Sequence, residues 1–201
     1  MRSPSSSHAR ISAILLAAGL SRRMGGTDKL LLEYCGKPLL SRAIDLMDSL
    51  PVHEKILVTT AERIKHVPVP GSIRALVNPC PEDGQSGSMR LGVMAASGEY
   101  YLFLAADQPL LEAADITPVL DAAEENKIVY PTVEGNPCTP ALFSAAFREE
   151  LLAQSGDCGG RLVRMAHPHA CRAMEAVNPG NFFDIDCAGS FLSLARGQAK
   201  S

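Results

Sequence analysis

A cluster of glycines and cations follows the first apolar segment of the chain, and these residues could bind phosphate. The apolar run ends at Gly19, and the loop after it carries Arg22, Arg23 and Lys29. Glycines at a turn let backbone N–H groups approach a ligand closely, and a run of such groups suits phosphate oxygens. The loop is neither a Walker A loop nor a dinucleotide-binding glycine motif, because its glycines are differently spaced and leucine follows the lysine. The alternative is a glycine-rich turn with a solvated basic face.

An aspartate at the end of a second apolar segment could hold a metal ion. Asp107 directly follows residues 100–106, the most apolar segment of the chain. Magnesium that bridges phosphates is usually held by one or two carboxylates together with phosphate oxygens. Asp107 would therefore supply a metal ligand beside the loop that binds phosphate. The alternative is that Asp107 caps a helix that begins near Glu112.

The pattern of apolar residues predicts the scaffold that brings these groups together. Short apolar runs alternate with segments of helical spacing, which predicts an α/β fold with a mostly parallel sheet and helices on both faces. Ligands bind such sheets beyond the carboxyl ends of the strands, where both polar clusters would lie. The expected strands are 11–17, 55–59, 73–77, 100–106 and 127–131, and the expected helices are 38–50, 86–97, 112–126 and 144–154.

Length and charge restrict the class of protein. The 201 residues suit one domain, which we expect over residues 11–201 after a loose, serine-rich tail at 1–10. The net charge of -3 argues against a general nucleic-acid binder, which needs a basic surface. No run approaches the roughly 20 apolar residues of a membrane span, and the tail lacks the apolar core of a secretory signal. We therefore expect a cytoplasmic protein with no nucleic-acid or membrane partner.

The basic loop resembles the signature of a known superfamily. Residues 16–25 read LAAGLSRRMG and, with Lys29 downstream, they resemble the nucleotidyltransferase signature L-A-A-G-x-S-x-R-M-G. Within the MobA-like members of that superfamily, the chain is most similar to the molybdenum cofactor cytidylyltransferases. The other segments that carry the resemblance are 84–92, 107–109, 135–137, 156–161 and 184–186.

The resemblance implies a three-layer α/β/α Rossmann-like fold and a magnesium-dependent transfer reaction. An acceptor phosphate would attack the α-phosphorus of a nucleoside triphosphate and pyrophosphate would leave in line, so positioning and charge stabilisation carry the catalysis. Arg23 and Lys29 would hold the triphosphate, and Asp107 would hold Mg²⁺. The residues expected around the nucleotide are Leu16, Ala17, Ala18, Gly19, Ser21 and Arg22, with Asn78 at the base or ribose and Ser86 and Ser88 at a helix N-terminus.

The later half of the chain is expected to bind the acceptor. By resemblance, Asn136, Pro137 and Asp157 are expected to lie toward the acceptor. Asp186 is the expected second metal ligand, with acceptor binding as its alternative. Asp157 is a rival for that metal contact, and it could instead cap a helix that begins at Gly159.

Three functions fit these residues. In the first, CMP passes from CTP to the molybdopterin form of the molybdenum cofactor, a substrate here rather than a prosthetic group. An alanine at position 18, where guanylyl-transferring relatives have a further glycine, favours the smaller pyrimidine. The second keeps the chemistry but uses GTP, or a sugar phosphate or other phosphorylated metabolite as acceptor. The third is a non-catalytic chaperone that delivers cofactor to an apo-molybdoenzyme; Arg23, Lys29 and Asp107 together favour catalysis over it.

Overall fold

The computed structural model describes residues 10–21 and 24–198. Arg22, Arg23 and all of the expected tail except Arg10 therefore lie outside the described residues. Among the residues described, no helix has the length and apolar character needed to cross a bilayer.

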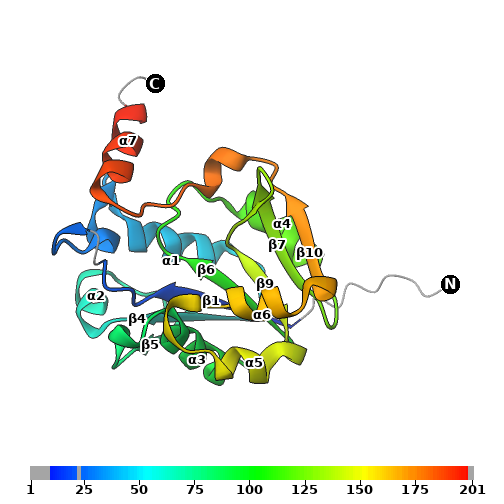
Figure 1. The fold of residues 1–201 in the computed structure, drawn as a ribbon. Helices are drawn as coiled ribbons and strands as arrows, with labels where there is room; N and C mark the ends of the chain where they lie inside the picture. Colours follow the sequence, from blue (N-terminus) through cyan, green and yellow to red (C-terminus); the bar gives the residue numbers. More distant parts are fainter. Residues whose placement is uncertain (1–9, 22–23, 199–201) are drawn as a thin grey trace.

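The centre of the molecule is a mixed, mostly parallel sheet, as the sequence predicts (Figure 1). Its main strands lie in the order β10-β7-β9-β6-β1-β4-β5, and the short β8 pairs with β7. β9 is antiparallel to both of its neighbours, whereas β1 is parallel to β4 and to β6. The strands are β1 (Ile11–Ala17), β4 (Glu54–Thr59), β5 (Arg74–Val77), β6 (Tyr100–Ala105), β7 (Ile128–Val133), β8 (Asn136–Pro137), β9 (Ala141–Ser144) and β10 (Cys171–Glu175).

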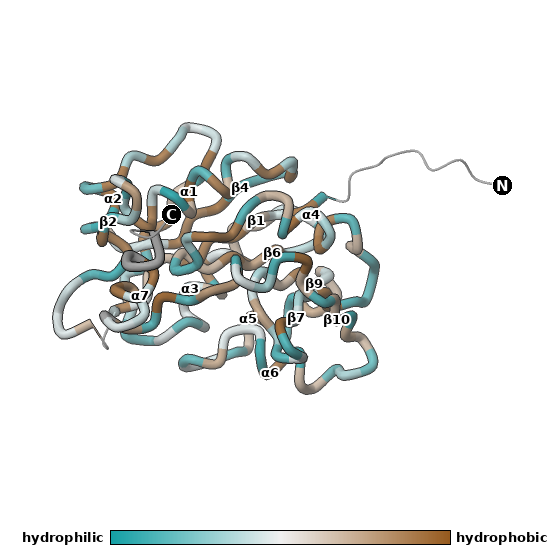
Figure 2. The backbone as a smooth tube through the Cα atoms, turned by 90° about the horizontal axis from the view of Figure 1, so that it is seen from above, coloured by the Kyte–Doolittle hydropathy of each residue, from teal (hydrophilic) through white to brown (hydrophobic). Residues whose placement is uncertain are grey.

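Helices cover both faces of this sheet, which confirms the three-layer α/β/α architecture. Alternate residues of β1 point to opposite faces, so Leu15 packs in one apolar cluster and Ile14 in the other. The first cluster holds α1 and α4, and the second holds α3, α5 and α6. Figure 2 shows hydrophobic residues along the central strands and more hydrophilic residues in the outer loops. The helices are α1 (Leu39–Ser49), α3 (Gln85–Ala95), α4 (Ala113–Asp121), α5 (Arg148–Ala153) and α6 (Arg161–Ala166).

Several elements were not expected from the sequence. They are the helix α2 (Ala61–His66), the strands β8, β9 and β10, and the small hairpin of β2 (Glu33–Tyr34) and β3 (Lys37–Pro38). The last helix is α7 (Ala188–Gln198). The expected helix 144–154 is shorter than predicted, because Ser144 ends β9 and a 3₁₀ turn precedes α5. The short 3₁₀ helices are η2 (Lys29–Leu31), η3 (Pro81–Asp83), η4 (Ala145–Phe147), η5 (Gly156–Cys158), η6 (Pro168–Ala170) and η7 (Pro179–Phe182).

Candidate active site

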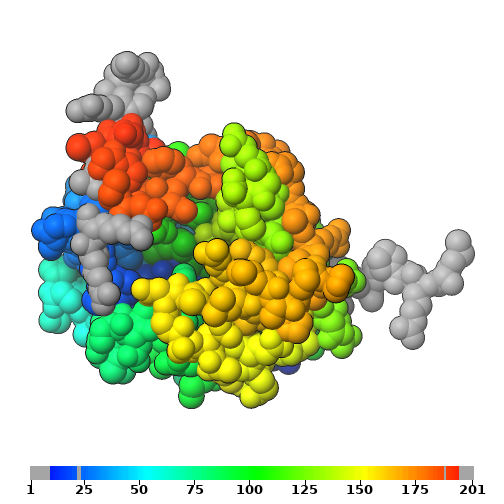
Figure 3. Space-filling view, in the orientation of Figure 1, coloured from blue at the N-terminus to red at the C-terminus, as the bar shows by residue number. Residues whose placement is uncertain are grey.

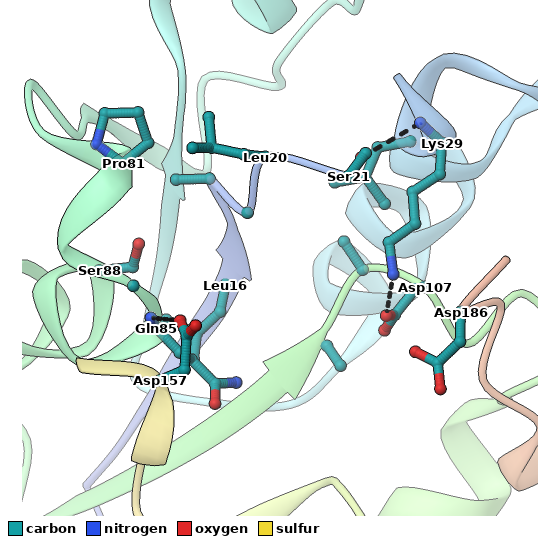
Figure 4. Close-up of a pocket in the computed structure, with 16 residues that line it drawn as sticks. Leu16, Leu20, Ser21, Lys29, Pro81, Gln85, Ser88, Asp107, Asp157 and Asp186 are labelled. Carbon is teal, nitrogen blue, oxygen red and sulfur yellow. Dashed lines mark hydrogen bonds and ion pairs between the residues drawn. The ribbon is translucent and has the colours of Figure 1, made fainter. Parts of the chain in front are cut away.

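A cavity of about 430 Å³ lies at the carboxyl ends of β1 and β6. It brings together segments that are far apart in the sequence: the loop after β1, the turn after β6, the start of α3, η5 and the segment before α7. The expected site residues in its lining are Leu16, Ala18, Gly19, Ser21, Lys29, Ser88, Asp107, Asp157 and Asp186 (Figure 4). The sheet edge chosen from the sequence is therefore where the polar residues converge.

One wall of the cavity is built around an ion pair. The Lys29 ammonium donates to Asp107 Oδ2 at 2.6 Å and to the Ile185 carbonyl oxygen at 2.9 Å. Figure 4 shows the Asp186 carboxylate on the same side of the cavity as this pair. Lys29 thus ties η2 to the end of β6 and to the chain before α7, and its charge balances that of Asp107.

A third carboxylate lies close to this wall. Loss of solvent around its carboxyl, followed by the charges of Asp107 and Asp186, raises the pKa of Asp184 to about 6. Asp184 as a whole is exposed to solvent, so we attribute its raised pKa mainly to the two neighbouring carboxylates. The Asp184–Asp186 segment stands out in the sequence, but sequence reasoning selected only its second aspartate. Asp184 is therefore a site residue that the prediction missed.

These carboxylates fit a hard divalent cation. Mg²⁺ takes oxygen ligands and usually keeps several positions for water and phosphate. In the part of the chain that the structure describes, no group of three or more histidine, cysteine or acidic residues is arranged to hold a metal by itself. Asp107 and Asp186 thus suit a cation whose remaining ligands come from a phosphorylated substrate, and they do not form a complete protein cage.

The alternative role for Asp107, a helix cap, is wrong. The N-cap of α4 is Glu112, whose side chain accepts from the backbone N–H of Asp115 while the Asp115 carboxylate accepts from that of Glu112. This capping box leaves no N-terminal role for Asp107. Its carboxylate instead faces the cavity with Lys29 (Figure 4).

The opposite wall is formed by the start of α3 and by η5. The backbone N–H of Gln85 donates to Asp157 Oδ1 at 3.1 Å, so this carboxylate caps α3 and not a helix at Gly159. Gly84 makes the contact possible: its φ is +81°, and a Cβ there would lie 2.3 Å from Asp157 Oδ1. The N-terminus of α3, expected to receive phosphate, already holds an anionic side chain.

Three residues expected around the nucleotide are not among the residues that line the cavity, and their contact with a nucleotide stays a prediction. Ser86 is fully buried, and its hydroxyl has no hydrogen-bond partner among the described residues; Ala17 is buried on the far face of β1. Asn78 is also buried, and its amide donates to Ser88 Oγ at 3.1 Å. Asn78 therefore supports Ser88, which does line the cavity. The periodicity of the sequence could not show which side chains turn inward.

A buried arginine, missed by the sequence analysis, fixes the loop after β1. Arg63 of α2 is 3% exposed and donates to both carboxylate oxygens of Asp28, at 2.7 and 2.8 Å. It also donates to the carbonyl oxygens of Ala17 at 2.6 Å and Gly19 at 2.7 Å. One guanidinium therefore joins the start of the loop to Asp28, the N-cap of the 3₁₀ helix that carries Lys29. The only sequence signal was an arginine in a short charged segment, which normally indicates a solvated helix.

Comparison with known proteins identifies the family. A model described as the MobA-like NTP transferase domain matches residues 13–171, most of the chain. The chain belongs to the MobA-like NTP transferase family.

Individual relatives are similar over different shares of their length. The molybdenum cofactor guanylyltransferase of Shewanella woodyi is 32% identical over 95% of this chain and 98% of its own length. The probable molybdenum cofactor guanylyltransferase of Methanosarcina acetivorans is 28% identical over 70% of this chain, but the match spans only 65% of that relative. A solved nucleotidyl transferase from Methanothermobacter thermautotroptrophicus superposes with a TM-score of 0.79 at 22% identity, covering 95% of this chain and 98% of that one. This last likeness shows the fold alone.

The remaining expected residues of this family member lie in a second cavity. Asn136 and Pro137 line a space of about 570 Å³ together with Tyr130, Arg161 and Arg164, and the two cavities share no lining residue. The acceptor site expected from the sequence is thus divided, because Asp157 lies with the nucleotide loop. Which ligand each cavity takes remains a prediction.

Proposed function

We propose that this protein transfers a nucleoside monophosphate from a nucleoside triphosphate to the phosphate of the molybdenum cofactor and releases pyrophosphate. The observation that carries this proposal is the position of Lys29 and Asp107 in one cavity with the loop after β1. That arrangement supports catalysis over a chaperone role, because a protein that only binds a nucleotide has no need of a paired cation and carboxylate there.

The reaction requires positioning and charge more than it requires a base. A phosphate nucleophile is already ionised near neutral pH, so one of its oxygens forms the new bond to the α-phosphorus as the bond to pyrophosphate breaks. The backbone N–H groups of the Gly19–Ser21 turn would hold phosphate oxygens. An ammonium has three donors, and Lys29 uses two of them on Asp107 and Ile185, so the third can reach a phosphate oxygen without breaking the ion pair.

Asp107 and Asp186, with Asp184 nearby, are the residues that would hold Mg²⁺. When bound, the ion would supply positive charge next to the phosphates of the leaving group. Lys29 would add its own positive charge at the same place. Arg23, which resembles the arginine of the superfamily signature, stays a prediction.

The preferred donor is proposed to be GTP. The relatives described above are named guanylyltransferases, and one of them aligns over nearly all of both chains. The cytidylyl transfer expected from the sequence rests on Ala18 alone, whose side chain lines the cavity and is 2% exposed. One buried methyl group is a weaker argument than those relatives, so CTP becomes the second candidate.

Pyrophosphate release tests the proposal directly. The purified protein is assayed with GTP, CTP, ATP and UTP in turn, with Mg²⁺ and molybdenum cofactor. Turnover with GTP is the expected result, preference for CTP would reverse the choice of base, and no cofactor-dependent release with any nucleotide would refute the function.

The Asp107→Asn variant tests the site. The amide keeps the shape of the side chain but removes the charge, so turnover should fall at least about tenfold. The matched control is Asp121→Asn, an exposed aspartate at the end of α4, which should turn over like the wild type. An Asp107→Asn variant that keeps full activity at limiting Mg²⁺ would remove Asp107 from the metal site.

A further inference from the structure

The second cavity is lined by two arginines that belong to none of the ion pairs among the described residues. Arg161 and Arg164 lie in its lining, one helical turn apart on α6. Over residues 10–21 and 24–198, neither guanidinium forms an ion pair with a carboxylate, although the chain carries a net charge of -3. Guanidinium groups are well suited to oxyanions and to flat, electron-rich groups. The cavity therefore has the charge of an anion site.

The shape of the lining adds a second property. The guanidinium of Arg164 lies over the ring of Tyr130, 4.7 Å from its centroid, so its planar group is held against a flat surface. Met165, Pro137 and Pro168 supply further apolar surface around it. A flat heterocycle with hydrogen-bond acceptors on its edge matches this lining better than a free phosphate, which would use the arginines and leave the apolar surface uncovered.

Segments that line the two cavities border one hollow of the surface. Figure 3 shows a hollow on this face, bordered by the yellow segment around α6, the yellow-green hairpin of β7 and β8, and the orange to red segment that leads to α7. A ligand with one end at Asp107 could extend between the hairpin and α6.

We propose that the second cavity binds the ring-bearing end of the acceptor, beyond the phosphate that reacts, and that Arg161 and Arg164 donate to the oxygen and nitrogen acceptors of the ring. This inference rests on the proposed function, because it takes the acceptor to be a phosphorylated pterin. It gives Asn136 and Pro137, which form the hairpin side of the cavity, a place beside the same ring. The donor nucleotide would not touch this cavity.

A binding assay without turnover tests the proposal. The probe is 6-hydroxymethylpterin monophosphate, titrated by its own fluorescence against the wild type, Arg161→Gln and the double variant Arg161→Gln with Arg164→Gln. The matched control is Arg74→Gln, which makes the same charge change on the exposed edge strand at the opposite end of the sheet. Calorimetry with GTP and Mg²⁺ is run on each protein, and circular dichroism checks the fold.

The double variant should bind the pterin phosphate at least about tenfold more weakly, since a charge-assisted hydrogen bond is worth roughly that factor. Its affinity for GTP should stay within about twofold of the wild type, and Arg74→Gln should leave both affinities unchanged. Arg161→Gln alone should show part of the loss, and it leaves the stack of Arg164 on Tyr130 intact should the double variant fold poorly.

Three results would overturn the proposal. One is a wild type that does not bind the pterin phosphate, and another is equal affinity in the wild type and the variants. The third is that inorganic pyrophosphate displaces the probe at concentrations as low as those at which the probe itself binds. That result would make the cavity a general anion site. The binding assay needs no transfer reaction, so its result can be interpreted even if pyrophosphate release fails. Failure of the proposed function is therefore distinguished from failure of this inference.

Discussion

Replacing Arg63 by methionine should loosen the loop after β1 and destabilise the whole protein. The substitution keeps most of the side-chain volume but removes all four hydrogen bonds of the guanidinium. It takes two donors from the carboxylate of Asp28 and one each from the carbonyl oxygens of Ala17 and Gly19, although the Leu30 backbone N–H still donates to Asp28 and the Thr59 hydroxyl to Ala17. The expected consequence is a less stable fold and weaker binding of nucleotide, because the loop is no longer held at both ends.

The size of the effect follows from the burial of the pair. Removing one partner of a buried ion pair costs about 3–5 kcal/mol, mostly because the other charge is left unpaired. The Arg63 side chain is 3% exposed but that of Asp28 is 31% exposed, so water can partly solvate the remaining carboxylate. We therefore expect the low end, about 3 kcal/mol, which corresponds to a fall in Tm of about 10 °C for a chain of this size.

Urea unfolding followed by circular dichroism measures this change. Arg74→Met is the matched control, since Arg74 is exposed and makes one long contact, at 3.4 Å, to the Ala95 carbonyl oxygen; it should stay within about 0.5 kcal/mol of the wild type. Adding Asp28→Asn to the Arg63→Met variant should recover part of the loss, because the unpaired charge is removed. The reasoning fails if Arg63→Met unfolds at the same urea concentration as the control.

Two further changes test the walls of the first cavity. The pKa of Asp184 is about 6, above its ordinary value. Between about pH 4 and pH 6 the folded protein therefore keeps a proton that the unfolded chain has released, and stability falls as pH rises through that window. Asp184→Asn should therefore raise the free energy of unfolding at pH 7 by about 1 kcal/mol, discounted because the residue is exposed, and change it little at pH 4; equal effects at both pH values would contradict this. Gly84→Ala should cost about 1–3 kcal/mol in urea unfolding, because φ is +81° and the new Cβ would collide with Asp157. Gly71→Ala, with open space around it, is the control, and equal stability of the two variants would show that the Gly84 turn can relax.

The central strands could be predicted because they are buried on both faces. β1 has the bounds expected from its sequence, and β4, β6 and β7 differ from the expected ranges by one or two residues at an end. A strand covered by helices on both sides is a continuous apolar run, which is a strong signal. The parallel arrangement followed from the helices between these strands, as did the sheet edge at which Asp107 and the basic loop lie.

Other elements depend on tertiary contacts that leave no local pattern. β9 is four residues long, and its antiparallel place between β6 and β7 is set by pairing across the sheet. β10 reads CRAME, without the alternation of a half-buried strand. In α2 only Arg63 is buried, so its sequence looks like an exposed charged turn although it carries the residue that organises the loop.

The site also depends on tertiary contacts that leave no local pattern in the sequence. Sequence reasoning identified Lys29 and Asp107 separately, from their places after two strands. Their ion pair joins residues 78 positions apart, and it depends on how η2 folds back over the sheet. The assignment of Asp157 to the acceptor followed its place in the second half of the chain and stays a prediction; the sequence could not show that Asp157 shares a cavity with the loop after β1.

The charges around the first cavity predict that the proposed reaction depends on added divalent cations. On one wall, the Lys29 ammonium pairs with Asp107. The charges of Asp107 and Asp186 raise the pKa of Asp184 beside it. With a pKa of about 6, Asp184 is mostly ionised at neutral pH, so it adds negative charge to this wall. A nucleoside triphosphate brings several more negative charges to this wall, and like charges at short range repel strongly in a partly desolvated site. A wall so acidic is unfavourable for a triphosphate alone and favourable for a triphosphate that arrives with a divalent cation. The carboxylates that make the free anion a poor ligand are thus the groups that would select its metal complex.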